Sequence, residues 1–172
     1  MRSYTIAAEV TPQGGAEGML VTEGGRFAGY GLYLLQSRPV FTLNLLDMER
    51  VRWEGKEPLA PGKHRVEFDC TYDGPGIGKG GTGVLKVDGT TVDTRTTPHT
   101  VPCIQSEDET FDVGVDMRTG VNDADYAPPF RFTGTLEKLT VQLGSPQPPT
   151  KILEIEKRLM ERAVQFQRSC GR

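Results

Sequence analysis

The residues best suited to hold a metal ion or a polar ligand are gathered in one acidic stretch between positions 108 and 125. Carboxylate oxygens on a loop are ligands that calcium prefers, and Gly114 and Gly120 would let this loop turn back on itself. The spacing departs from the twelve-residue EF-hand pattern, so a solvated acidic loop is the simpler interpretation and contact with a polar ligand is a third. The candidate calcium ligands are Asp112, Asp116, Asp123 and Asp125.

No set of residues has the spacing of a catalytic site. A strand that presents catalytic carboxylates on one face needs them at alternate positions, as in Glu-x-Asp-x-Glu, whereas Glu107, Asp108 and Glu109 are consecutive. The two histidines, His64 and His99, have no neighbouring partners for a triad or a metal cage. We therefore predict no catalytic residue.

A glycine-rich run at residues 74–83 contains a formal G-x-G-x-x-G from Gly76 to Gly81, with Lys79 inside it. A phosphate-binding loop must open a helix whose first amides hold the phosphate, and here a strand and a hairpin follow instead. We interpret the run as a connection that needs positive φ angles.

The three cysteines are an odd number in a long chain and fit no zinc pattern. Cys70 continues the alternation of Val66 and Phe68, so we expect a small buried residue there. Cys103 cannot be placed from the sequence, and Cys170 lies close to the end of the chain. Structural or inert roles are the expectation for all three.

Aromatic rings could stack on a sugar, and the candidates are Tyr30, Tyr33, Trp53 and Tyr126. In alternating strands most such rings pack in the core or in hairpin pairs, which is the competing interpretation. We keep Tyr30 and Trp53 as candidate contacts to a ligand or partner.

The elements that must position these residues are short strands. Apolar and polar residues alternate with period two, which predicts half-buried strands, over residues 4–10, 66–70, 85–87 and 139–143. Asp88-Gly89 is a strong hairpin signal, and residues 36–38 join two further strands. About ten strands with turn residues between them predict an all-β fold, a two-sheet jelly-roll sandwich. A closed up-and-down barrel is the main alternative.

The pattern changes near the C-terminal end. Residues 145–150 form a proline-rich linker after a β-sandwich domain at 1–144, and residues 151–172 read as one amphipathic helix and a tail. The apolar stripe of that helix consists of Ile152, Ile155, Leu159, Ala163 and Phe166. Alone such a helix is marginal in water, so we expect it to dock on the sandwich, on another domain or on a second copy of itself.

Composition excludes two classes of partner. The formal net charge of −3, with both signs interspersed, offers no field for a polyanion, so nucleic acid is not expected. No apolar run is long enough to span a membrane, and the first residues lack the apolar core of a signal peptide. We expect a soluble chain.

Several sequence segments, in the same order along the chain, resemble the C-terminal region of bacterial arylsulfatases. The first is residues 23–34, Glu-Gly-Gly-Arg-Phe-Ala-Gly-Tyr-Gly-Leu-Tyr-Leu, and others lie at 44–50, 61–64, 78–83, 108–114 and 129–138. The resemblance spans residues 3–143. It implies a concanavalin A-like jelly roll that acts as an accessory domain beside a catalytic domain.

The catalytic part of that family has no counterpart here. Sulfatases of this kind need a Cys or Ser in a Cys/Ser-x-Pro-x-Arg motif, and residues 37–41, Ser-Arg-Pro-Val-Phe, end in Phe where Arg is required. No cysteine is followed by the motif, and no α/β alternation exists to carry the metal-binding residues. No catalytic residue can be carried over from the family.

Three hypotheses for function follow. The leading one is a non-catalytic accessory domain that packs on a sulfatase-like catalytic domain, with Arg26, between glycines, facing that partner or its anionic substrate; alternatively, Arg26 pairs with a carboxylate of this chain. The second is a lectin-like module for a sulfated or acidic glycan, with calcium as its candidate cofactor. The third is a homo-oligomer joined through the helix at 151–167.

Overall fold

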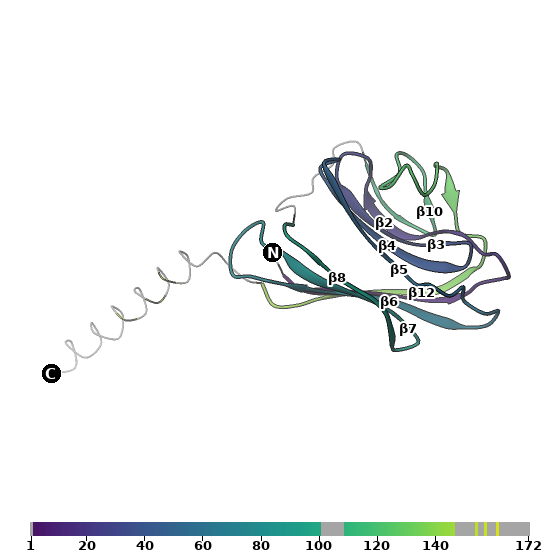
Figure 1. Ribbon diagram of the computed structural model, residues 1–172, viewed down its shortest axis with the longest axis horizontal. Coiled ribbons are helices and arrows are strands. Elements are labelled where there is room, and N and C mark those ends of the chain that lie inside the picture. Colours follow the sequence, from purple (N-terminus) through teal and green to yellow (C-terminus); the bar gives the residue numbers. More distant parts are fainter. Residues whose placement is uncertain (1, 101–108, 147–153, 155–156, 158–160, 162–172) are drawn as a thin grey trace.

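The alternating runs of the sequence form two layers of strands that face each other (Figure 1). The computed structural model describes residues 2–100, 109–146, 154, 157 and 161. The predicted two-sheet sandwich is confirmed, and the closed barrel is not formed. Most of the helix predicted at 151–172 and most of the linker at 145–150 lie outside the described residues, and both stay predictions. Among the helical residues that are described, none belongs to a segment that could cross a membrane.

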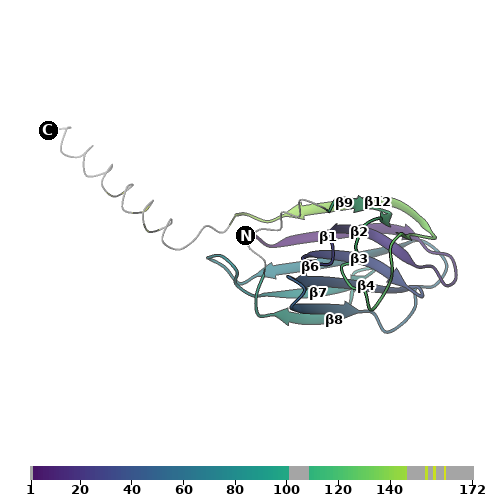
Figure 2. The ribbon, with the colours of Figure 1, turned by 90° about the horizontal axis from the view of Figure 1, so that it is seen from above.

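The first sheet has five antiparallel strands in the order β12-β1-β6-β7-β8. All four runs predicted from their alternation lie in it, and so does the hairpin at Asp88-Gly89. Figure 2 shows these strands side by side, with β12 at one edge and β8 at the other. The strands are β1 (Tyr4–Thr11), β6 (His64–Tyr72), β7 (Gly81–Val87), β8 (Thr90–Thr97) and β12 (Thr135–Leu143).

The second sheet has seven strands and is built around two hairpins. Its long strands are β2 (Gly18–Gly24), β3 (Gly29–Leu35), β4 (Arg38–Leu45) and β5 (Glu49–Glu54). Three short strands extend it beside β2, namely β9 (Phe111–Val113), β10 (Val115–Asp116) and β11 (Phe130–Arg131). The edge strand β5 approaches β8 of the first sheet, which closes that side of the sandwich.

Three aromatic rings join the two sheets in the interior. Phe41 of β4 stacks on Phe68 of β6 with ring centroids 3.5 Å apart. The indole of Trp53 on β5 packs edge-on against Phe41 and Phe68, and its Nε1 donates a hydrogen bond of 2.9 Å to the carbonyl oxygen of Gly83 on β7. The edge strand β5 is thereby tied directly to the opposite sheet.

The central strands of the second sheet are buried on both faces. In β3, Leu32 and Leu34 point into the sandwich, while Tyr33 lies in a second apolar cluster on the outer face. Residues 117–129, the covering loop, run across this outer face and contribute Val121 and Tyr126 to that cluster. A sheet with apolar residues on both faces needs such a cover, because exposed rings would face water.

The outer face of the first sheet is charged instead. Arg65 Nη2 lies 2.6 Å from Glu67 Oε2, and Lys86 Nζ pairs with Asp69 on the next strand. These partly exposed pairs are typical of a solvated sheet face and contribute little to stability.

A substitution at Gly83 tests the contact of the three aromatic rings between the two sheets. A Cβ there would lie 2.6 Å from ring atoms of both Phe68 and Trp53, so Gly83→Ala must push the rings apart. We expect a loss of about 1–3 kcal/mol in the free energy of unfolding by urea. Gly14→Ala is the matched control, since a Cβ at Gly14 meets nothing within 4 Å. Equal stability of the two variants would contradict the close packing of these rings against Gly83.

Candidate functional site

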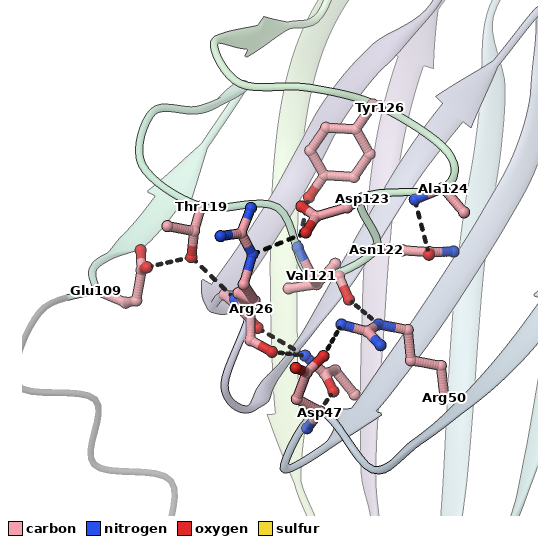
Figure 3. A network of polar contacts seen from close by, with 12 residues as sticks. Arg26, Asp47, Arg50, Glu109, Thr119, Val121, Asn122, Asp123, Ala124 and Tyr126 are labelled. Atoms are coloured by element: carbon pink, nitrogen blue, oxygen red, sulfur yellow. Dashed lines mark hydrogen bonds and ion pairs between the residues drawn. The ribbon is translucent and has the colours of Figure 1, made fainter.

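Three connections meet at one end of the sandwich, and we call this the loop end (Figure 3). They are the β2–β3 turn at residues 24–29, the β4–β5 turn at 45–49 and the covering loop. Asn44 Nδ2 donates hydrogen bonds of 2.8 and 2.7 Å to the carbonyl oxygens of Gly25 and Arg26. Arg50 Nε donates to the carbonyl oxygen of Val121 at 2.9 Å. The three connections are therefore held as one unit.

Arg26 lies at the centre of this unit. Its amide donates to Thr119 Oγ1, and its Nε donates to Asp123 Oδ2 at 2.8 Å. The hydrogen bond and charge of Asp123 raise the pKa of the Arg26 guanidinium. Arg26 is thus paired with a carboxylate of this chain, as the alternative interpretation held, while 51 % of its side chain stays exposed.

The predicted aromatic contacts point into the molecule. Trp53 is 1 % exposed and belongs to the core, so its prediction as a ligand contact is corrected: an aromatic ring on an edge strand can still reach across to the opposite sheet. Tyr30 is part-buried and lies between Phe41 and Tyr4, with centroid distances of 6.0 and 6.4 Å. Burial raises the pKa of its hydroxyl.

The four candidate calcium ligands are not brought together. Among the described residues, no three His, Cys, Asp or Glu side chains are grouped as a metal site would need. Each carboxylate is used by its own partner: Asp112 by Thr110, Asp116 by Tyr126, Asp123 by Arg26, and Asp125 by Arg52 and Tyr33. The four carboxylates are thus engaged with separate partners, and calcium binding stays a prediction.

Asp116 and Asp125 show how the covering loop is fastened. Asp116 is 2 % exposed, burial raises its pKa, and it accepts a hydrogen bond of 2.5 Å from the Tyr126 hydroxyl. Asp125 accepts a bond of 2.7 Å from Arg52 Nε. Burial alone would lower the pKa of Arg52, but its hydrogen bonds to Glu54 and Asp125 raise it. The acidic stretch is therefore largely structural.

A second surface, absent from our sequence-based candidates, lies between the edges of the two sheets. We call it the β5–β8 groove, and its two adjoining hollows measure about 560 and 360 Å³. Five cations and three carboxylates line it, and two further carboxylates, Asp47 and Asp125, form ion pairs with Arg50 and Arg52. The cations are Arg38, Arg50, Arg52, Lys56 and Arg95, and the carboxylates are Glu49, Glu54 and Asp93.

The groove cations fall into two groups. Arg50 and Arg52 are part-buried and engaged with the covering loop. Arg38, Lys56 and Arg95 are exposed; Arg95 Nε donates to Asp93 at 2.9 Å, and in the described part of the chain Arg38 and Lys56 form no ion pair. Thr94 and Thr96 add hydroxyl groups along the same wall. This set can bind anionic and hydroxyl groups of one ligand.

Comparison with known proteins gives the fold and no family. No protein-family model matches the chain, and no curated protein matches its sequence. Domains LG4–5 of the mouse laminin alpha1 chain match with a TM-score of 0.57 and 15 % identity, over 84 % of this chain and 37 % of that one. The LG1–3 region of the laminin alpha2 chain matches with a TM-score of 0.51 and 16 % identity, over 84 % and 30 %.

The fold is a laminin G-type jelly roll. The jelly-roll part of the expected resemblance is confirmed, whereas neither these structures nor the sequence comparisons connect the chain to sulfatases. The chain spans about a third of the length of each of these solved laminin regions.

Tyr126 tests the role of the covering loop. Its hydroxyl donates to Asp116 and accepts the amide of Val121, so Tyr126→Phe leaves two buried polar groups without that partner. We expect a loss of about 1–3 kcal/mol in unfolding free energy, measured by urea denaturation. In the Asp116→Ala background the loss from Tyr126→Phe should be smaller, and an undiminished loss there would argue against the pairing.

Proposed function

We propose that the chain is a non-catalytic recognition module of lectin type that binds an acidic or sulfated glycan along the β5–β8 groove. The observation that carries the proposal is that Arg38 and Lys56 lie exposed on this surface and form no ion pair in the described part of the chain. The laminin G-type fold is consistent with a binding module, but at such low identity it supports the architecture alone.

The chemistry of the groove suits such a ligand. Guanidinium groups bind sulfate and carboxylate oxygens through paired, charge-assisted hydrogen bonds, and Arg38 and Arg95 are exposed to do so. The hydroxyls of Thr94 and Thr96 can donate to or accept from sugar hydroxyls. The strand β5 has six residues, so the groove is about 20 Å long and accommodates an extended oligosaccharide.

Two side chains that could do covalent chemistry, His64 and Cys70, are held in structural roles in the described part of the chain. Both ring nitrogens of His64 are occupied, with Nδ1 2.7 Å from Asp88 and Nε2 2.9 Å from the carbonyl oxygen of Ala60. Cys70 is part-buried, and burial raises the pKa of its thiol, which disfavours the reactive thiolate. Binding without turnover is the function that these side chains support.

Removing two exposed cations tests the groove. We expect Arg38→Gln with Arg95→Gln to weaken binding of a heparin-derived hexasaccharide about tenfold, since each exposed contact contributes up to about 1 kcal/mol. Isothermal titration calorimetry would measure this, with a neutral oligosaccharide as the ligand control. Lys63→Gln with Lys138→Gln removes the same charge from another exposed surface and should change little. Equal weakening by both double variants would show that binding depends on the net charge of the chain and not on the groove.

The same titration addresses calcium. Because the candidate carboxylates are engaged with separate partners, we expect the affinity for the hexasaccharide to be the same with calcium and with a chelator. Loss of binding in the chelator would support calcium as a cofactor.

Self-association through residues 151–167 remains a prediction. Light scattering on the chain with and without those residues would test it.

A second candidate function rests on the loop end. Four large apolar side chains are exposed there, namely Phe27 at 74 %, Leu46 at 52 %, Met48 at 81 % and Met117 at 56 %. Leu46 also has a φ of 57°, a conformation that branched residues rarely adopt. Apolar side chains at the tips of hydrogen-bonded loops fit packing against a larger protein, and a sulfatase-like catalytic domain, with Arg26 facing it, is the proposed partner.

This packing can be tested in solution. The chain would be mixed with an arylsulfatase catalytic domain that lacks its own C-terminal region and analysed by size-exclusion chromatography. We expect co-elution that Phe27→Ser with Met48→Ser abolishes, while the unfolding temperature stays unchanged because both side chains are exposed. No co-elution of the unmodified chain would end this second candidate.

A further inference from the structure

An apolar cavity adjoins the β5–β8 groove at the end of the sandwich opposite the loop end. It measures about 370 Å³, within the range of small-molecule sites. Its apolar walls come from Pro39 on β4, Pro58 and Leu59 in the β5–β6 connection, and Val87 and Val92 on the β7–β8 hairpin. Glu57, Ala60 and His64 also line it, and it is partly open to solvent.

The walls of the cavity are held by backbone hydrogen bonds. Gly55 N donates to the carbonyl oxygen of Pro39 at 2.9 Å, and Leu59 N donates to that of Ser37 at 2.8 Å. A Cβ on Gly55 would lie 2.7 Å from the Pro39 ring, so the close approach of Gly55 to that ring favours glycine. A cavity with walls fixed in this way costs little ordering when a ligand enters.

The cavity and the groove share a wall. Lys56 and Val92 line both, and Arg38 and Arg95 lie on the groove side of that wall. A ligand that fills the cavity with an apolar group can therefore place an anion beside Lys56 and Arg38. Lys56 and Arg38 are both exposed and form no ion pair in the described part of the chain, so both cations are available to a ligand.

We propose that this cavity binds the apolar group of an amphiphilic anion, an alkyl or aryl sulfate or carboxylate, whose charged end lies against Lys56 and Arg38. The inference rests on the proposed function in one respect, because the anion uses cations of the β5–β8 groove. It adds that ligands with an apolar substituent next to the anion bind more tightly than the anion alone.

Three probes separate the contributions in calorimetric titrations of the full chain: hexyl sulfate below its micelle-forming concentration, hexyl glucoside and inorganic sulfate. We expect saturable binding of hexyl sulfate, and affinities at least about tenfold lower for the other two probes, which each lack one half of the recognition. Equal affinities for hexyl sulfate and inorganic sulfate would overturn the proposal, and so would equal affinities for hexyl sulfate and hexyl glucoside.

Two variants locate the site. Val92→Ser removes an apolar group from the cavity wall, and Lys56→Gln removes the shared cation. Each should weaken the binding of hexyl sulfate about tenfold. Val84→Ser is the matched control, since Val84 lies on β7 outside the cavity. Full affinity in both site variants would overturn the proposal, and Lys56→Gln keeps it testable if Val92→Ser folds poorly.

The hexasaccharide used for the groove distinguishes the two proposals. Binding of hexyl sulfate without binding of the hexasaccharide would remove the glycan function and leave the cavity. Binding of the hexasaccharide, with hexyl sulfate no better than inorganic sulfate, would remove the cavity and leave the glycan function.

Discussion

Phe41 of one sheet lies flat against Phe68 of the other, and Trp53 packs edge-on against both rings. Large rings bury more apolar surface than any other side chains, so this contact sets how the two sheets sit on each other. The bond from Trp53 to Gly83 adds a fixed point on the edge strand β5. The approach of β5 to β8 follows from it, and with that approach come the β5–β8 groove and the cavity at its end.

A second constraint acts on the opposite face of the second sheet. Because its central strands are apolar on both sides, a loop must cover Tyr33 and Val40, and that loop carries the polar groups that hold it in place. Asp125 of the loop and Asp116 of β10 take part in holding it, through Arg52 and Tyr126 respectively. Few polar groups of the covering loop are left for a ligand, whereas the exposed cations of the groove are not needed to hold the fold.

The sequence predicted the fold better than the site. Period-two alternation identified β1, β6, β7 and β12, and Asp88-Gly89 identified a hairpin, because these signals are local. Trp53 was misplaced because nothing in its own neighbourhood reveals the Gly83 carbonyl opposite.

The groove was missed for a similar reason. Its cations come from β5 and β8, which are far apart in the chain and adjacent only after the sandwich closes. A usable signal existed on β5, where Arg50 and Arg52 alternate with Val51 and Trp53. The acidic stretch, by contrast, suggested a metal site because carboxylates that are close in sequence can still face different partners.

The pairing of β1 with β12 has a consequence for how the protein acquires its structure. Tyr4 lies opposite Leu143, so the first strand of the sandwich is completed by one of the last to be synthesised. Contacts between such distant segments close slowly, because the chain between them must first be ordered. During synthesis β1 can pair with β6 on one side only, and its other edge stays open until residue 143 has left the ribosome. A nascent chain that stalls before that point exposes an unpaired edge, the kind of surface that chaperones must shield from neighbouring chains.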